Sequence, residues 1–581
     1  MTITKTPISK LHKHIQFSVT LNWRVKCITI LLLTLLSISS YAQITFTKSP
    51  INGQLVGRNL STNLGQVTIE GHVDNRIVDY SEIQIDKYRN NVYVETFSTT
   101  LNYVQNISAF NFSISIPAEL ANYSFKIYGK NGNALTLEKE IFDIVAGDVY
   151  IIQGQSNAEA PMFNGDVDVF QHNFIRVYAG GFDNEFSLLS NDRWYLAQGN
   201  GHRNTDGNVG QWGLKTAYSI VSSTDIPVAI FNGAHSGKQI DFFQAQDDYQ
   251  ITLDSNYSRL YHRLNKTNLK DFVRGVLWAQ GETDASIGTT IDQYKDKFIA
   301  LKNSWLTDYP NIEHIYIFQT KNGCGVPLLN LIEIKEAQRQ LADENPDITI
   351  IPTAATTHHS DDCHFPLVNG YEVFSDRLSP LIQRDLYNVS TSLDIDAPMI
   401  QNAWLSDSNT LIVETDSKTA LEIKTVAEDF YLLNGGEDIS NLITNISVEN
   451  NNIVFSLSET PAIGSTITYL AQISGTGNFI TNANNLELIC FHNYTIDASN
   501  VLSSTDFDTN QKLKIFPNPS VDTIQVLGVT DTKQFQIYDL SGFRVLTGST
   551  SNEDKIYIQN LPIGMYVLKL ETGEVLKFVK E

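Results

Sequence analysis

The stretch GDVYIIQGQSNA, residues 147–158, organises the interpretation of the whole chain. Its apolar run Val149–Ile152 predicts a buried strand. The strand ends at Gly154, where the absence of a Cβ lets the backbone turn sharply, and Asn157 can cap the helix or turn that follows. Ser156 therefore lies just past a strand end, where a nucleophile could face a crevice. A Gly-x-Ser motif alone is weak, because ordinary polar loops also contain it.

The composition bounds the class of protein. With 581 residues the chain is too long for one core, so several domains are expected. Hydrophobic residues make up 42% and charged residues 18%, which is typical of globular proteins. The net charge of -23 argues against a nucleic-acid partner, which requires a basic surface. It suits an extracellular protein.

Residues 1–42 have the features of a secretory signal peptide. Basic residues between positions 5 and 26 precede an apolar run at 27–38, and Ser40-Tyr41-Ala42 provides a small-x-small cleavage site. The apolar run is short for a membrane anchor, and no other segment is apolar enough to span a bilayer. We therefore expect export, with no transmembrane span once the signal is removed.

The hydrophobic pattern divides the rest of the chain into domains. Residues 43–146 alternate with period two, which predicts an antiparallel β-sandwich, and residues 393–500 return to that pattern. Between them, residues 147–392 alternate strands with helices, which predicts an α/β domain with a parallel sheet covered on both faces. A polar linker is expected at 501–512 and a small β module at 513–581.

Within the central domain the chemistry-capable residues follow the predicted strands. Strands are expected at 149–152, 226–232, 274–280, 315–319 and 348–352, and helices at 211–222, 290–309, 328–344 and 370–386. In open α/β sheets, ligands bind outside the carboxyl ends of the strands. One site built from four of these loops is therefore expected.

Three side chains in these loops could form a catalytic triad. A serine needs a base to act as a nucleophile at neutral pH. Asp361 and His364 are three residues apart on one loop, so the carboxylate can orient the imidazole while the other ring nitrogen faces Ser156. Asp362 is adjacent, and Asp361 is preferred on spacing alone.

The oxyanion hole and the substrate pocket would use the same loops. An oxyanion hole needs donors that converge where charge develops. The candidate donors are the backbone N–H groups of Ser156 and Gly237 and the side-chain amide of Gln280. The candidate substrate-binding residues are Gln155, Asn232 and His235. Asn232 is an equally good candidate for a brace of its own loop.

The segment HHSDDCH, residues 358–364, could also form a zinc cluster. It lacks two ligands at an established structural spacing, and zinc would explain neither the Ser156 loop nor the Gln280 loop. We therefore expect no metal and no cofactor.

The cysteines predict one disulfide. Cysteine pairs in exported proteins are usually oxidised. Cys324 and Cys363 each follow a predicted core strand, so we expect this pair to be bonded and Cys490 to be left over.

Taken together, four motifs resemble the sialate O-acetylesterase-like branch of the SGNH hydrolases, which includes plant and bacterial carbohydrate acetylesterases. They span about residues 147–390 and are Gly154-Gln155-Ser156-Asn157, Asn232-x-Ala234-x-x-Gly237, Gln280-Gly281-Glu282-Thr283-Asp284 and Asp361-x-x-His364-x-Pro366. The resemblance implies a flavodoxin-like three-layer sandwich, no metal, and Ser156, Asp361 and His364 as the triad.

Two positions depart from the pattern of those hydrolases. The wider superfamily has Gly-x-Asn-Asp in its third block, whereas this chain has Gly281-Glu282-Thr283-Asp284. The usual Asn is missing, and Gln280 would take its place. A single Gly237 followed by Lys238 replaces the more usual glycine pair, which puts the second oxyanion donor in question.

The final module resembles the C-terminal sorting domain of type IX secretion. The matching residues are Phe516-Pro517-Asn518-Pro519, Tyr538-Asp539-Leu540-Ser541-Gly542 and Leu561-Pro562-x-Gly564-x-Tyr566. This resemblance implies export across the outer membrane, followed by release or surface attachment.

The sequence therefore predicts a secreted serine esterase that removes O-acetyl groups from carbohydrate such as sialic acid or xylan. Its expected partners are the acetylated carbohydrate and the type IX secretion machinery. Two alternatives stay open: an esterase that acts on a non-sugar ester, and a carbohydrate-binding or adhesion protein whose hydrolase domain is idle. An intact triad disfavours the idle protein.

Overall fold

The computed structural model describes residues 44–180, 183–423, 429–470, 479–497, 513–529, 531–539, 543–551, 554–572 and 574–581. The expected signal peptide and the expected linker at 501–512 lie outside these residues. The chain forms two compact units, divided between residues 499 and 500. None of the helices in the described part of the chain is long and apolar enough to cross a membrane.

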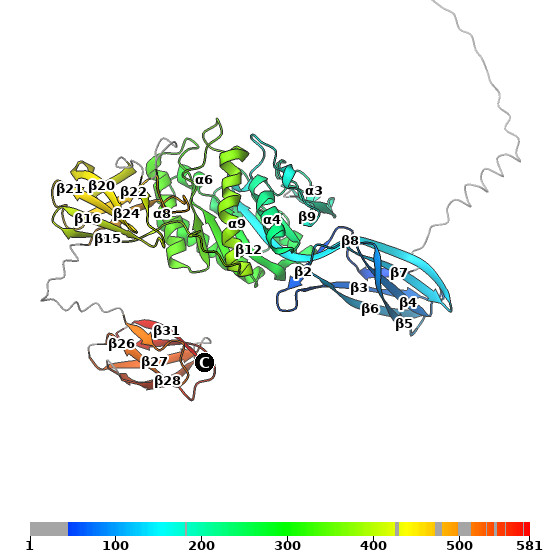
Figure 1. The fold of residues 1–581 in the computed structure, drawn as a ribbon. Coiled ribbons are helices and arrows are strands. Elements are labelled where there is room, and N and C mark those ends of the chain that lie inside the picture. The colour runs from blue at the N-terminus through cyan, green and yellow to red at the C-terminus, as the bar shows by residue number, and fades with distance from the viewer. Residues whose placement is uncertain are drawn as a thin grey trace, which may run out of the picture. The chain divides into compact units, whose positions relative to one another are not determined.

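Strand β8 (Ala134–Gly154) organises the first unit. Its first half pairs antiparallel with β7 (Tyr123–Asn131), and its second half pairs in parallel with β11 (Val228–Asn232) and β12 (Val273–Ala279). Figure 1 shows β8 running from the N-terminal strands into the central part of the unit. The domain boundary expected at residue 146 therefore falls inside a single continuous strand of 21 residues.

The N-terminal strands form two sheets around a shared apolar core. One sheet contains β1 (Ile44–Lys48), β2 (Leu55–Asn59), β3 (Leu64–Asp74) and β6 (Ile107–Pro117). The other contains β4 (Glu82–Arg89), β5 (Val92–Thr100), β7 and the first half of β8. Burial alternates along β6, as expected for a strand with one face on the core.

The central sheet is mostly parallel. Its order is β9 (Ile175–Tyr178), β11, β8, β12, β13 (His314–Phe318) and β14 (Ile348–Ile351), each parallel to its neighbour. The edge strand β10 (Trp194–Leu196) pairs antiparallel with β9. The strands expected from the sequence are all present, whereas β9 and β10 are not predicted by its pattern.

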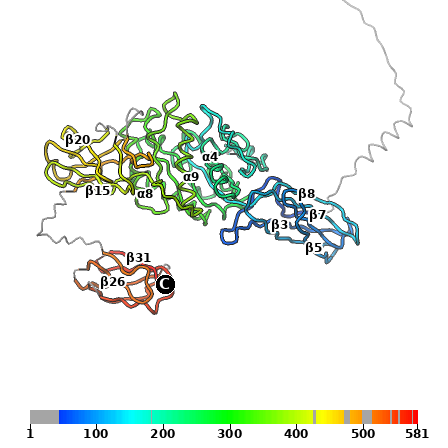
Figure 2. Tube along the Cα trace, viewed as in Figure 1, coloured from blue at the N-terminus to red at the C-terminus, as the bar shows by residue number. Residues whose placement is uncertain are grey.

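Helices cover both faces of the central sheet because successive strand residues point to opposite sides. Tyr150 and Ile152 pack with α4 (Gln211–Thr224) and α9 (Glu372–Tyr387), which lie side by side in Figure 2. Val149 and Ile151 pack on the other face. The helices of that face are α5 (Asn256–Lys266), α7 (Ile291–Asp308) and α8 (Leu328–Glu344).

Asp148, in the middle of β8, is buried in a charged cluster. Its carboxylate accepts hydrogen bonds from Arg58 at 2.8 and 2.6 Å, from Arg274 at 2.9 Å and from the Tyr387 hydroxyl at 2.7 Å. Arg58 lies on β2, Arg274 on β12, and Tyr387 at the end of α9. One carboxylate therefore joins the N-terminal strands to the central sheet and to one of its covering helices.

Two further β regions complete the chain. In the first unit, one sheet contains β15 (Ile400–Asp407), β16 (Thr410–Thr415), β20 (Ile443–Glu449) and β21 (Asn452–Leu457), and another contains β18 (Phe430–Asn434), β19 (Glu437–Asp438), β22 (Thr466–Tyr469) and β24 (Phe491–Thr495). They share an apolar core. The second unit has sheets of β25 (Lys514–Phe516), β26 (Thr523–Leu527) and β29 (Ile556–Tyr557), and of β27 (Lys533–Asp539), β28 (Arg544–Thr550), β30 (Gly564–Leu570) and β31 (Val575–Lys580).

Candidate active site

The turn after β8 places Ser156 at the carboxyl edge of the central sheet. Gly154 has a φ of 130°, and a Cβ there would lie 2.1 Å from the Ala279 carbonyl oxygen at the end of β12. Only glycine allows the two strand ends to approach so closely. Ser156 begins the short helix α2 (Ser156–Glu159). Its hydroxyl and backbone N–H make no hydrogen bond with any residue that the structure describes.

Asp361, and not Asp362, binds His364. His364 Nδ1 lies 2.6 Å from Asp361 Oδ2, while Asp361 Oδ1 accepts the backbone N–H groups of Cys363 and His364 at 3.1 and 3.0 Å. Partial burial would raise the pKa of Asp361, but these hydrogen bonds outweigh it and hold that pKa well below its usual range. Asp362 instead faces His358 Nδ1 at 3.0 Å. The geometry therefore selects Asp361 as the carboxylate that orients His364.

The Ser156 turn and the Asp361–His364 loop are in contact. Asn157 Nδ2 donates to the Cys363 carbonyl at 3.3 Å, and the Phe163 ring stacks on the His364 imidazole with centroids 4.4 Å apart. No hydrogen bond joins Ser156 to His364 in this structure. Catalytic hydrogen bonds are often long before substrate binds and shorten in the complex with substrate.

A disulfide bonds Cys324 to Cys363, the pair expected from the sequence, and Cys490 is buried and free. The Cα atoms are 4.2 Å apart, slightly closer than the range of about 4.4–6.8 Å that is usual for disulfides. Cys324 also donates its backbone N–H to the Asp362 carbonyl at 2.7 Å. The loop after β13 is thus attached to the His364 loop by a covalent bond and a hydrogen bond.

The histidine-rich segment is not arranged as a set of metal ligands. Cys363 is in the disulfide, and His358 and His364 face different aspartates. Across the described ranges of the chain, no three His, Cys, Asp or Glu side chains converge in a way that could hold a metal ion.

The expectation that the Gln280 amide faces Ser156 is wrong. Gln280 Nε2 donates to the Lys238 carbonyl at 3.2 Å and to the Asp284 carboxylate, and Gln280 Oε1 accepts the Tyr294 hydroxyl at 2.9 Å. The side chain is buried, and its donors and acceptor are already engaged within the protein. Gln280 therefore braces the loops after β11 and β12 and is not available as an oxyanion donor.

Two of the three candidate substrate-binding residues are also engaged within the protein. Asn232 Nδ2 donates to the carbonyls of Ala158 and Val209, and its Oδ1 accepts the Ala234 N–H, so Asn232 is a loop brace. His235 has one ring nitrogen 3.0 Å from the Ser236 carbonyl and the other 3.3 Å from Asp183. Neither residue has a free polar atom in its side chain for a substrate.

Gln155 differs from these two residues. Its Oε1 accepts the N–H groups of Gly281 and Thr283 at 3.3 and 3.1 Å, which ties the Ser156 turn to the loop after β12. Its amide nitrogen has no partner among the described residues. Gln155 therefore keeps its place as a candidate contact for substrate.

Gly237 retains the features needed for an oxyanion donor. Its φ is 67°, a Cβ there would meet open space, and its backbone N–H has no partner within the described residues. It lies in the loop after β11, whose residue His235 donates its N–H to the Gly154 carbonyl at 2.9 Å. The loop that carries Gly237 is thus held against the Ser156 turn.

Two buried acidic residues lie near Ser156, and sequence reasoning missed the first of them. Glu159 is buried one helical turn after Ser156, and its contacts are described below. Glu282 accepts the Asn157 amide at 2.9 Å, and its second carboxylate oxygen is buried without a hydrogen-bond partner among the described residues. Burial raises the pKa of Glu282. The sequence does place a carboxylate one helical turn after the serine, and this spacing could have identified Glu159.

Comparisons with known proteins match two segments of the chain to families. Residues 146–375 match the family model described as carbohydrate esterase, sialic acid-specific acetylesterase, and residues 514–581 match the secretion system C-terminal sorting domain. No curated protein sequence matches the chain.

Among solved structures, a carbohydrate acetylesterase from Xanthomonas citri is 16% identical, with 77% of this chain and 99% of that chain covered and a TM-score of 0.55. A protein from Arabidopsis thaliana is 16% identical, with 42% and 98% covered and a TM-score of 0.33. A family two carbohydrate esterase from Clostridium thermocellum, in complex with cellohexaose, is 10% identical, with 60% and 98% covered and a TM-score of 0.26. Only the first bears on the fold, because the TM-scores of the other two are low.

The site and the two family matches lead to one assignment. The family match spans the Ser156 turn and the Asp361–His364 loop, and the sorting-domain match spans the last β module. The protein is a carboxylic ester hydrolase that is secreted or attached to the cell surface through type IX secretion. Its residues 146–375 belong to the carbohydrate esterase family of sialic acid-specific acetylesterases, and its residues 514–581 are a secretion system C-terminal sorting domain.

Proposed function

We propose that this secreted esterase removes O-acetyl groups from carbohydrate through an acetyl-enzyme formed on Ser156. The observation that carries the proposal is the hydrogen bond of 2.6 Å between His364 and Asp361, on a loop that contacts the Ser156 turn. A serine hydrolase triad consists of a serine, an imidazole and a carboxylate that orients the imidazole. Ser156, His364 and Asp361 are the residues that we assign to it.

The chemistry follows from the protonation of these groups. His364 Nε2 takes the proton of the Ser156 hydroxyl while the oxygen attacks the acetyl carbonyl. Asp361 holds Nδ1–H and stabilises the imidazolium that forms, and its lowered pKa keeps it ionised throughout. His364 then gives the proton to the departing sugar oxygen. Water attacks the acetyl-enzyme by the same route and releases acetate.

The oxyanion of each tetrahedral intermediate needs fixed donors. The backbone N–H groups of Ser156 and Gly237 supply them, and each lacks a partner among the described residues. The amide nitrogen of Gln155 is a candidate contact for the sugar or the acetyl group, since no described residue binds it.

The strand order supports a flavodoxin-like three-layer sandwich for the catalytic domain. Numbered along the chain, β8, β11, β12, β13 and β14 are arranged as 2-1-3-4-5, which is the flavodoxin-like order of doubly wound sheets. The domains are proposed to be the signal peptide (1–42), two β-sandwiches (43–146 and 393–500) flanking the hydrolase domain (147–392), the linker (501–512) and the sorting domain (513–581).

The substrate class rests on the comparisons. The matching family model is described as sialic acid-specific, and the Xanthomonas citri protein is described as a carbohydrate acetylesterase. We therefore propose an acetylated sugar, either sialic acid or a polysaccharide such as xylan, as the substrate.

One experiment tests both the chemistry and the substrate. The purified protein is treated with a fluorophosphonate, and the labelled peptide is identified by mass spectrometry. Acetate release is then measured from acetylated xylan, from acetylated sialic acid and from 4-nitrophenyl acetate. Label on Ser156 with loss of activity supports the mechanism, and label on another residue overturns it. Activity on 4-nitrophenyl acetate with none on either sugar would point to a non-sugar ester, and no activity on any substrate to an idle domain.

A further inference from the structure

Glu159 is a buried carboxylate that the triad does not use. It is the last residue of α2, three residues after Ser156, and its exposed fraction is 1%. Burying a carboxylate is costly unless it is paired and hydrogen-bonded. The groups that pair with Glu159 therefore indicate what it holds in place.

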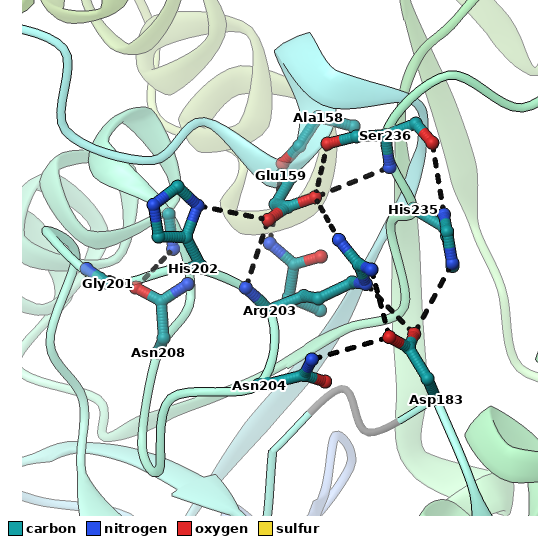
Figure 3. Close-up of polar contacts among 12 residues, drawn as sticks. Ala158, Glu159, Asp183, Gly201, His202, Arg203, Asn204, Asn208, His235 and Ser236 are labelled. Carbon is teal, nitrogen blue, oxygen red and sulfur yellow. Dashed lines mark hydrogen bonds and ion pairs between the residues drawn. The ribbon is translucent and has the colours of Figure 1, made fainter.

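Glu159 joins three segments of the chain around the Ser156 turn. Figure 3 shows its carboxylate between Ser236, on the loop after β11, and Arg203, on the loop after β10. Glu159 Oε2 accepts the Ser236 hydroxyl at 2.6 Å and the Ser236 N–H at 3.3 Å. Glu159 Oε1 accepts the Arg203 N–H at 3.0 Å, and the Arg203 guanidinium lies 3.4 Å from Oε2. The charge is thus neutralised by Arg203 while the hydrogen bonds fix Ser236.

The residue that Glu159 fixes precedes the proposed oxyanion donor. The peptide bond between Ser236 and Gly237 is planar, so it carries the Ser236 carbonyl and the Gly237 N–H in one rigid unit. Glu159 holds the N–H and the hydroxyl of Ser236, on either side of the Cα where that unit begins, and His235 Nδ1 lies 3.0 Å from the carbonyl of the unit. His235 Nε2 in turn faces Asp183, which binds Arg203 through both carboxylate oxygens at 2.9 Å. The cluster in Figure 3 therefore closes a ring of contacts on this one peptide.

We propose that Glu159 is a positioning residue that fixes the peptide bond between Ser236 and Gly237, so that the Gly237 N–H donates to the oxyanion of the acetyl ester. The inference rests on the proposed function, in which Gly237 supplies that donor. Gly237 has a positive φ and no side chain to pack, so its own contacts do not hold it. The direction of the Gly237 N–H is therefore set by Ser236, which Glu159 holds in place.

The test compares Ser236→Ala with Ser236→Thr, using 4-nitrophenyl acetate as the substrate. Each rate is divided by the concentration of active enzyme, which is measured by labelling Ser156 to completion with a fluorophosphonate. Alanine removes the hydroxyl that binds Glu159 but keeps the backbone. We expect kcat to fall about 10- to 100-fold with KM within about twofold, because a displaced donor weakens transition-state binding more than substrate binding. Threonine keeps the hydroxyl and should restore kcat to within about threefold.

A double-mutant cycle separates this role from general damage to the fold. Glu159→Gln replaces one carboxylate oxygen with an amide nitrogen, which cannot accept a hydrogen bond from Ser236 or Arg203. We therefore expect it to lower kcat by a similar factor. Adding Ser236→Ala to it should change kcat by less than about twofold, because both substitutions break the same contact. Asn204→Ala is the matched control. It removes a hydrogen bond of 3.3 Å to Asp183 at the exposed edge of the same cluster, and kcat should stay within about twofold.

Three outcomes would overturn the role of Glu159. They are a Ser236→Ala enzyme no slower than Asn204→Ala, a loss confined to KM, and fully multiplicative effects in the double variant. The proposed function is judged separately by Ser156→Ala. If Ser156→Ala stays active, the triad assignment fails whatever Ser236 does. If it is inactive while Ser236→Ala has normal kcat, only the positioning role fails.

Discussion

Two buried carboxylates belong to the same stretch of chain, yet their partners differ in kind. Asp148, in the middle of β8, binds residues of β2, β12 and α9, which are regular elements with fixed backbones. Glu159, just past the end of β8, binds Ser236 and Arg203, which lie on loops. Both carboxylates are paired with arginine. The same ionic chemistry therefore joins regular elements of the fold at Asp148 and joins the loops around the candidate active site at Glu159, where we propose that it orients a reacting group.

The largest effect is expected for Ser156→Ala, which removes the proposed nucleophile at the loop end of β8. We expect kcat to fall by at least about 10⁴-fold, since loss of a triad nucleophile leaves only binding and oxyanion stabilisation. The midpoint of thermal unfolding should stay near that of the wild type, because the hydroxyl has no hydrogen-bond partner in the part of the chain that the structure describes. Ester hydrolysis and thermal unfolding measure the two quantities. Turnover close to that of the wild type would refute the triad.

Asp361→Asn should have the next largest effect, a fall in kcat of about 10³-fold, because the amide favours the wrong imidazole tautomer. It also tests a pH dependence. The folded pKa of Asp361 lies below its ordinary value of 3.8, so its contribution to stability is complete above that pH and is lost as the pH falls through the folded pKa. Thermal unfolding between pH 2 and pH 5 should show a smaller acid-induced loss for Asp361→Asn. An identical acid profile would contradict this assignment.

Asp148→Asn should leave the active site intact and weaken the fold. It leaves Arg58 and Arg274 with a neutral partner in a buried place, and breaking such a pair costs about 3–5 kcal/mol. The first unit should unfold at a lower temperature, while kcat on 4-nitrophenyl acetate at 25 °C stays within about twofold. A large loss of kcat in folded Asp148→Asn enzyme would show that the Asp148 cluster also affects the active site, and would contradict the distinction between the Asp148 and Glu159 clusters.

The double variant Cys324→Ser with Cys363→Ser tests whether the disulfide next to His364 stabilises the fold or positions the His364 side chain. A disulfide closing a loop of this length typically contributes about 2–4 kcal/mol. Because Cys363 directly precedes His364, we also expect activity to fall at temperatures below the unfolding transition. Activity and unfolding are followed on one temperature ramp. Loss of both at the same temperature would show that the bond acts on stability alone.

The smallest effect is expected for Glu282→Gln. Burial raises the folded pKa of Glu282 above its ordinary value of 4.5, so its contribution to stability declines as the pH rises from that value through the folded pKa. Glutamine keeps an oxygen for the Asn157 amide and carries no charge. The unfolding midpoint of Glu282→Gln relative to the wild type should therefore rise between pH 4 and pH 8. A difference that does not change with pH would contradict the raised pKa.

The sequence predicted those parts of the fold that rest on long apolar periodicity. Helix α7 begins and ends within a residue of its expected range because Tyr294, Phe298 and Trp305 form one apolar stripe. Helix α5 was missed because its buried face includes Ser258, Arg259 and Arg263, whose polar atoms find partners only in the folded protein. The hydrophobic pattern of a sequence does not show such tertiary contacts between polar groups.

The candidate site was predictable where residues are close in sequence and was not where distant loops meet. The spacing of Asp361 and His364 gave their hydrogen bond, which local geometry determines. Gln280 was misassigned because its donors are taken by Lys238 and Asp284 and its acceptor by Tyr294, a residue of α7. Which polar group is already engaged depends on the whole arrangement of loops and cannot be deduced from one motif.

The continuous strand β8 constrains the order in which the exported chain can fold. Its first half can pair with β7 at once, since a short turn joins them, whereas the second half must wait for β11 and β12, which are made much later. Parallel pairing across long sequence separations is slow, and an apolar strand edge left open during that delay is prone to aggregate. The run Val149–Ile152 that leads to the proposed nucleophile is therefore also the segment that needs protection from aggregation until the central sheet closes.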